Sequence, residues 1–107
     1  MKSYRILCLG LALVITPIAL AKLSISNDAL GRVEGTLDFC AQTDAQSAPN
    51  YQERKKAVVQ DASQEELAEA RASQEYRDAY DSTTSELAKV PKKRVVEACT
   101  ALLKSDK

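Results

Sequence analysis

The sequence predicts an all-α protein, a small bundle of three to four helices stapled by one disulfide between the first and last helices of the mature chain. Three observations support this fold class. Apolar residues recur at helical spacing, good helix formers such as Ala, Glu, Lys, Gln and Leu dominate after residue 21, and no alternating strand pattern of useful length occurs. A length of 107 residues allows one domain.

Residues 1–21 are predicted to be a secretory signal peptide that is cleaved after Ala21. A short basic start precedes an apolar run over residues 6–20, and Ala19-Leu20-Ala21 supplies the small-x-small cleavage pattern. The alternative is an uncleaved membrane anchor. The run is shorter than the roughly 20 residues that span a bilayer, and Pro17 would disturb a spanning helix.

The mature chain, residues 22–107, is therefore expected to be a single helical domain. We expect it to be periplasmic or secreted, behind a bacterial-type signal, with no stable membrane insertion after cleavage. Cys8 leaves with the signal, so Cys40 and Cys99 remain. Two cysteines in a small exported chain predict a structural disulfide. In the chain-entropy model, closing a loop of about 60 residues stabilises the fold by about 4 kcal/mol.

The first mature helix is expected to start at a cap, Asn27 or Asp28, and to run to about Ala41. Its apolar residues share one face and are spaced three, four and three residues apart: Leu30, Val33, Leu37 and Cys40. A polar stretch over residues 42–48 ends it. Ser47 and Pro49 then indicate the start of a second helix.

One helical stripe continues from residue 51 to residue 90. Because Ser63-Gln64-Glu65-Glu66 has the form of a capping box, we expect a break near residues 61–63 and a third helix that continues to residue 90. Pro91 is expected to open the last helix as its first residue. That helix should reach about Leu103 and bury the face that carries Cys99.

Two sets of residues are candidates for binding a partner. Tyr76 and Tyr80 lie one helical turn apart, flanked by the oppositely charged pairs Arg71/Glu75 and Arg77/Asp81 at the same spacing. The alternative is a core-facing tyrosine stripe between solvated ion pairs.

The second set is Gly31, Gly35 and Phe39, which share the helix face opposite Leu30 and Leu37. Each glycine inside a helix costs about 1 kcal/mol relative to alanine, so close approach is expected there. Either a partner docks on Phe39 across a glycine-lined groove, or the first helix is sandwiched between neighbours on both sides.

The remaining charged clusters are better explained as solvent-exposed helix faces than as binding or catalytic sites. The basic runs 54–56 and 92–94 lack interleaved aromatic residues and have acidic neighbours. Glu34 with Asp38, and the glutamates over 65–69, lack the looped ligand set of a calcium site and the cleft of an acid–base pair.

The composition makes an enzyme, a metal site, a cofactor or a nucleic-acid partner improbable. With no His, the common zinc-ligand sets and the Ser-His and Cys-His pairs are excluded. The 15 Lys+Arg and 15 Asp+Glu residues balance, unlike the basic excess of nucleic-acid binders. The leading expectation is a non-enzymatic exported protein that binds another envelope or secreted macromolecule.

A second expectation is a periplasmic stress chaperone of the acid type. The run Val95-Val96-Glu97-Ala98-Cys99-Thr100 is similar to the region around the second cysteine of acid-activated periplasmic chaperones. The chain also resembles that group in size, helicity and its single long-range disulfide. The surroundings of Cys40 depart from the group's pattern. The resemblance implies a protein that exposes apolar faces when conditions loosen the bundle.

The expected processing can be checked by the intact mass of the exported protein after alkylation, with and without reduction. We expect the mass of residues 22–107, with two thiols that react only after reduction. A mass that retains residues 1–21, or thiols that react in the native protein, would contradict the signal peptide or the disulfide.

Overall fold

The computed structural model describes residues 25–105, and every regular element in that range is helical. The predicted signal peptide lies outside the described residues. The elements in chain order are α2 (Asn27–Thr43), η2 (Ala45–Ser47), α3 (Ala48–Val58), α4 (Gln64–Ala72), α5 (Gln74–Ala88) and α6 (Lys92–Lys104). The all-α class is confirmed, but these five α-helices exceed the three to four that the sequence predicts.

The additional helix arises at Ser73, where the expected long third helix divides into α4 and α5. Ser73 has extended backbone angles, φ −73° and ψ 154°, and its side chain accepts a hydrogen bond from the backbone N–H of Tyr76 at 3.2 Å. Its hydroxyl donates to the carbonyl oxygen of Ala70 at 2.7 Å. One serine thus ends α4 and caps α5.

The other helix ends follow the sequence signals with small shifts. The capping box is present as predicted, with reciprocal bonds between Ser63 and Glu66 at 2.9 and 3.1 Å. The cap of α2 is Ser26 instead of Asn27 or Asp28, because its hydroxyl reaches the N–H of Ala29. Pro91 caps α6, which begins one residue later than expected, at Lys92.

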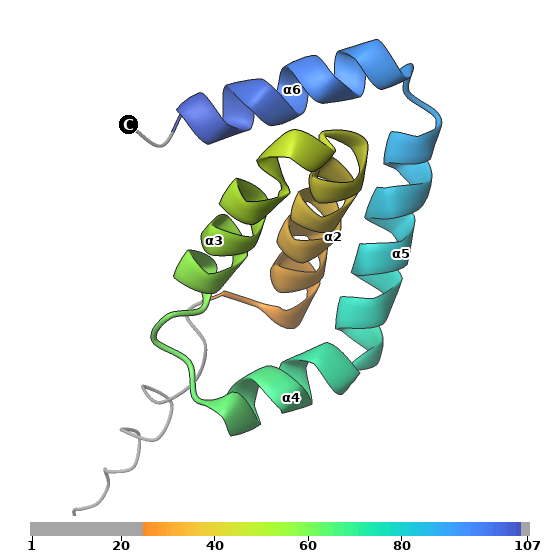
Figure 1. Cartoon of the computed structure of the whole chain (residues 1–107). Coiled ribbons are helices and arrows are strands. Elements are labelled where there is room, and N and C mark those ends of the chain that lie inside the picture. The colour runs from red at the N-terminus through yellow and green to blue at the C-terminus, as the bar shows by residue number, and fades with distance from the viewer. Residues whose placement is uncertain (1–24, 106–107) are drawn as a thin grey trace, which may run out of the picture.

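Helix α2 lies at the centre of the bundle (Figure 1), in contact with each of the other helices. Helices α3 and α5 flank it, α3 antiparallel and α5 parallel, while α4 and α6 cross near its two ends. This arrangement places one helix between neighbours on both sides, as the glycine-bearing face of α2 suggested.

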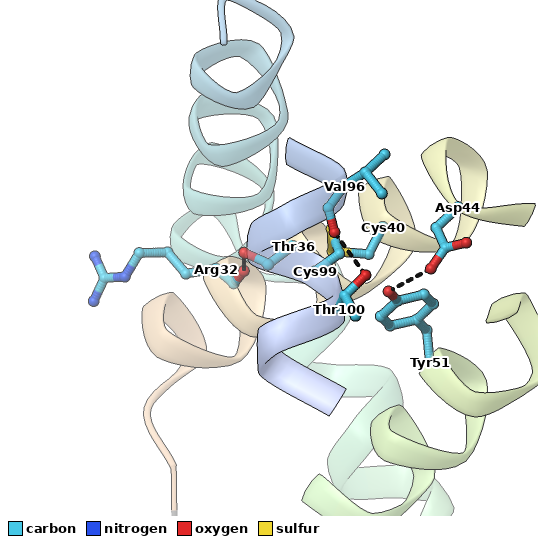
Figure 2. The surroundings of a disulfide bond; sticks show 8 residues. All are labelled: Arg32, Thr36, Cys40, Asp44, Tyr51, Val96, Cys99 and Thr100. Carbon is cyan, nitrogen blue, oxygen red and sulfur yellow. Dashed lines mark hydrogen bonds between the residues drawn. A yellow bond between two sulfur atoms is a disulfide. The ribbon is translucent and has the colours of Figure 1, made fainter. Parts of the chain in front are cut away.

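The predicted disulfide joins α2 to α6 and lies within the larger of two apolar clusters (Figure 2). Cys40 and Cys99 are bonded, with their Cα atoms 5.7 Å apart. The buried members of this cluster are Leu37, Cys40, Tyr51, Val95 and Cys99. Tyr51 is fully buried, and its hydroxyl donates to Asp44 at 3.0 Å, which satisfies the polar atom of an otherwise apolar side chain.

The second cluster is smaller and lies at the other end of α2. Its buried members are Leu30 of α2, Val59 directly after α3, and Ala70 of α4. Partly buried side chains that include Leu67 and Tyr76 surround it. No disulfide links the elements of this half among the described residues.

Helices α2 and α5 approach closely because glycines face the backbone of α5. A Cβ atom built on Gly31 would overlap the carbonyl oxygen of Tyr76 and lie 3.1 Å from the Cβ of Ala79. At Gly35 a Cβ would lie 3.2 Å from the carbonyl oxygen of Tyr80. The two glycines therefore set the distance between the two helices.

Helix propensity alone predicts that replacing Gly31 by alanine stabilises the protein, whereas these contacts predict that it destabilises the protein. Gly31→Ala gains about 1 kcal/mol of helix propensity but forces a backbone carbonyl to move, and overpacking costs about 1–3 kcal/mol. We expect a net loss of up to about 2 kcal/mol in urea unfolding. Gly35→Ala is the matched control and should be close to neutral. Equal stability of both variants would show that α5 does not pack on Gly31 as described.

Candidate functional site

A buried glutamate on α2 forms the centre of the most unusual polar cluster in the described structure. The side chain of Glu34 is 1 % exposed. Arg71, at the end of α4, donates to it twice, from Nε to Oε1 at 2.9 Å and from Nη2 to Oε2 at 2.5 Å. Tyr76 of α5 adds a hydroxyl bond to Oε1 at 2.6 Å. A buried carboxylate thus receives a bidentate cation and a phenol.

Asp38 repeats this arrangement one helical turn later. Lys55 of α3 donates to Oδ1 at 2.8 Å, and the Tyr80 hydroxyl donates to Oδ2 at 2.5 Å. Both members of the ion pair are 22 % exposed. We refer to Glu34, Asp38 and their four donors together as the carboxylate cluster.

The cluster changes the titration of its donors. Burial raises the pKa of Tyr76 well above the usual range for tyrosine, and the hydrogen bond to Glu34 adds to this effect. Burial likewise raises the pKa of Tyr80, with a further contribution from its bond to Asp38. The hydrogen bond to Glu34 raises the pKa of the Arg71 guanidinium.

All four carboxylate oxygens accept hydrogen bonds, so the cluster connects helices. Glu34 links α2 to α4 and α5, and Asp38 links α2 to α3 and α5. An open cavity of about 400 Å³ lies beside the cluster, with Arg77 and Asp81 also in its lining. The arrangement couples the charge of the carboxylates to the packing of the helices. Because each carboxylate joins α2 to two other helices, a change in its charge weakens the contacts among three helices at once.

The structure brings Tyr76 and Tyr80 together as the sequence suggests, with ring centroids 5.8 Å apart. The two arginines beside them do not form the ion pairs that the sequence suggests. Arg71 bonds Glu34 instead of Glu75, because the bend at Ser73 places residues 71 and 75 on different helices. Arg77 donates to the carbonyl oxygen of Ala72 and to Gln74.

Of the remaining candidate residues, the two glycines are covered by α5, whereas Phe39 lines an open hollow. Gly31 and Gly35 face α5 of the same chain, so a partner could reach them only if α5 moved. Phe39 is half-buried and lines an open hollow of about 460 Å³ at the turn between α5 and α6. Val90, 39 % exposed, lies in the same hollow. Partner binding at these residues stays a prediction.

One of the two basic runs is engaged within the protein, contrary to the expected solvated face. Lys55 bonds Asp38, and Arg54 donates to the carbonyl oxygen of Leu103 at 2.9 Å. The run 92–94 is exposed as expected.

The sequence analysis considered Glu34 and Asp38 only as a metal or acid–base pair and did not predict that they are buried and join helices. The signal was present in the helix periodicity: Glu34 lies four residues after Leu30 and three before Leu37, on the apolar stripe. An acidic residue at such a position requires partners when it is buried, and those partners come from distant parts of the chain.

Comparison with known proteins found no match to a family model, to a curated protein or to a solved structure. Within residues 25–105, no helix has both the length and the apolar character needed to cross a membrane. The same residues contain no group of three or more His, Cys, Asp or Glu that could hold a metal ion.

The tyrosines predict a loss of stability in alkali. Burial, with the bond to Asp44, raises the pKa of Tyr51 from 10.0 to about 12. A raised pKa in the folded state means that the folded protein keeps a proton that the unfolded chain has lost. The stabilisation is therefore complete below pH 10 and is lost as the pH rises towards 12, and Tyr76 and Tyr80 act in the same direction.

This expectation is measured by urea unfolding as a function of pH, with tyrosinate absorbance followed in parallel. Tyr51→Phe should make the alkaline fall in stability shallower. Tyrosinate absorbance that rises in the folded protein at the same pH as in the urea-unfolded chain would contradict the burial of these hydroxyls.

Proposed function

We propose that the protein is an exported, non-enzymatic stress chaperone that binds other proteins when acid opens its helical bundle. The proposal belongs to the wider class expected from the sequence, a protein that acts by binding another macromolecule. The observation that carries it is the Glu34 carboxylate, 1 % exposed and bonded to Arg71 and Tyr76.

Acid acts directly on this cluster. Protonation of carboxylates that are paired in the native state is the main cause of acid unfolding. A neutral Glu34 no longer balances the charge of Arg71, and a neutral Asp38 no longer balances Lys55. The chain has 15 Lys+Arg residues against 15 Asp+Glu, so protonation of the acidic residues also leaves the molecule strongly cationic and self-repelling.

The bonds of Glu34 and the disulfide hold different helices on α2, which makes the opening selective. Most of the contacts that acid weakens attach α4 and α5 to α2, and one more, between Asp38 and Lys55, attaches α3. The disulfide keeps α2 and α6 joined at any pH. Release of α4 and α5 uncovers the smaller apolar cluster, which is centred on Leu30 and, among residues 25–105, contains no disulfide. This surface is the proposed site for client proteins.

Two further observations support the proposal. The disulfide fits a periplasmic or extracellular protein, which is exposed to the external pH. The run from Val95 to Thr100, which resembles acid-activated chaperones, lies on α6 at the disulfide.

The direct experiment follows the aggregation of an acid-sensitive test enzyme by light scattering, with and without the protein, from neutral pH to about pH 2, the range over which carboxylates titrate. We expect suppression only in acid. Glu34→Gln removes the negative charge that pairs with Arg71 and should move the onset of suppression towards neutrality by about one pH unit. Glu86→Gln is the matched control, because Glu86 and Lys89 form a pair whose side chains are 71 % exposed, and it should leave the onset unchanged.

Helical circular dichroism at neutral pH shows whether the Glu34 variant is folded. If it is not, Tyr76→Phe removes a single donor and should give a smaller shift in the same direction. Failure to suppress aggregation at any pH would contradict the proposal. Equal suppression at neutral and acid pH would instead favour a binding surface of the folded bundle, and Phe39→Ala would then be the variant to examine.

A further inference from the structure

Residues 64–88 favour one continuous helix by their sequence, although the structure breaks this segment at Ser73. The segment contains no proline and no glycine, and most of its residues are good helix formers such as Ala, Glu, Gln and Leu. A break leaves backbone groups at the two new helix ends without helical partners, and the Ser73 hydroxyl bonds only one N–H and one carbonyl oxygen of them. The bend between α4 and α5 (Figure 1) therefore needs support from contacts elsewhere in the molecule.

That support comes from Glu34, which is bonded from both sides of the bend. Arg71, two residues before Ser73, donates to it from Nε at 2.9 Å and also from Nη2. Tyr76, three residues after Ser73, donates to the same carboxylate at 2.6 Å. One buried negative charge on α2 thus holds α4 and α5 at the angle seen in the structure.

A straight helix could not keep the inward-facing side chains of α4 and α5 on one side. Successive residues of an α-helix are rotated by about 100°. In a continuous helix, Leu67 and Tyr76 would point in opposite directions, about 180° apart, and Ala70 would lie about 120° from Tyr76. In the structure all three pack in the same apolar cluster, with Leu30 and Val59. The bent and straight forms are therefore alternatives, because the straight form must withdraw one side of the bend from this cluster.

We propose that α4 and α5 form a two-state switch: when Glu34 loses its charge, they join into one helix over residues 64–88, and this straightening opens the apolar cluster around Leu30. The inference deepens the acid-controlled opening and rests on the proposed function. The segments on either side, 59–63 and 89–91, lie outside the α-helices and absorb the change in direction. The switch makes the opening cooperative, because residues on both sides of Ser73 change their contacts in one event.

Other charged and titratable groups also face Glu34 or line the cavity beside it. They are Arg71 of α4, Tyr76, Arg77, Tyr80 and Asp81 of α5, Lys55 of α3 and Asp38 of α2. Acid also neutralises Asp38, but its donors are Lys55 and Tyr80, and neither lies on α4. Loss of that charge loosens α3 and α5 and leaves the bond between Arg71 and Glu34 in place. A variant of Glu34 at neutral pH therefore separates the effects of the two carboxylates.

The experiment measures the distance between spin labels on Glu65→Cys and Ser85→Cys, two exposed positions on α4 and α5, in the protein with its disulfide intact. A continuous helix places these positions about 30 Å apart, and a bend shortens this distance. We expect the short distance at neutral pH and a narrow distribution at the longer value in acid, with the helical circular dichroism retained. Glu34→Gln should give the long distance at neutral pH. Glu97→Gln, at an exposed glutamate of α6, is the matched control and should keep the short one.

Gln74→Pro tests the switch from the other direction. Residue 74 is the first residue of α5, where proline fits, and Ser73 before it is already extended. The same proline inside a continuous helix would clash with the preceding turn. We expect this variant to keep the bent form at neutral pH and to lack the long distance in acid, and a long distance in it would overturn the proposal. This comparison stands even where Glu34→Gln fails to fold.

The straightening and the chaperone function fail separately. Suppression of aggregation in acid with an unchanged short distance, or with a broad distribution and loss of helical circular dichroism, would overturn the straightening and leave the function standing. A long distance in acid without suppression of aggregation would support the straightening and contradict the function.

Discussion

The burial of Glu34 on the apolar side of α2 is the constraint on which the rest of the fold depends. A carboxylate removed from water needs a cation and hydrogen-bond donors, and Arg71 and Tyr76 supply both. These two donors lie five residues apart, and they reach the same acceptor because Ser73 turns the chain between them. The glycines of α2 then allow α5 to come close enough for the Tyr76 hydroxyl to reach α2. The bend at Ser73, the close contact between α2 and α5 and the ion pair with Arg71 thus all serve to give the buried Glu34 carboxylate its partners.

The bundle combines two ways of holding helices together. Around the disulfide, apolar burial and a covalent bond fix α2, α3 and α6, and neither depends on carboxylate charge. Around Glu34 and Asp38, ion pairs and phenol hydroxyls attach α4 and α5 to α2, and Lys55 adds a polar bond from α3. A small domain with few buried side chains gains specificity from such a cluster, because a shifted helix would leave a carboxylate unpaired.

Local signals made much of this structure predictable. The capping box at Ser63, the proline before α6 and the spacing from Leu30 to Cys40 gave the helix class and the disulfide that joins α2 to α6, because each depends on neighbouring residues or on compartment chemistry. The break at Ser73 was missed because a serine inside a charged, helix-forming segment reads as continuous helix. The break becomes favourable only because Arg71 bonds Glu34, which lies 37 positions away in the chain. Pairings of this kind are tertiary, and periodicity carries no information on which distant cation meets a buried acid.

The link between Cys40 and Cys99 also changes what a single cut in the backbone does to the molecule. Helices α3, α4 and α5 lie between the two cysteines, so this part of the chain is a closed covalent ring. The segment between α3 and α4, which includes exposed Gln60 and Asp61, lies within that ring. A protease that cleaves there converts the ring into two pieces that remain one molecule, and no fragment is lost until the sulfur–sulfur bond is also broken. In an oxidising compartment rich in proteases, a nicked copy therefore keeps all of its helices.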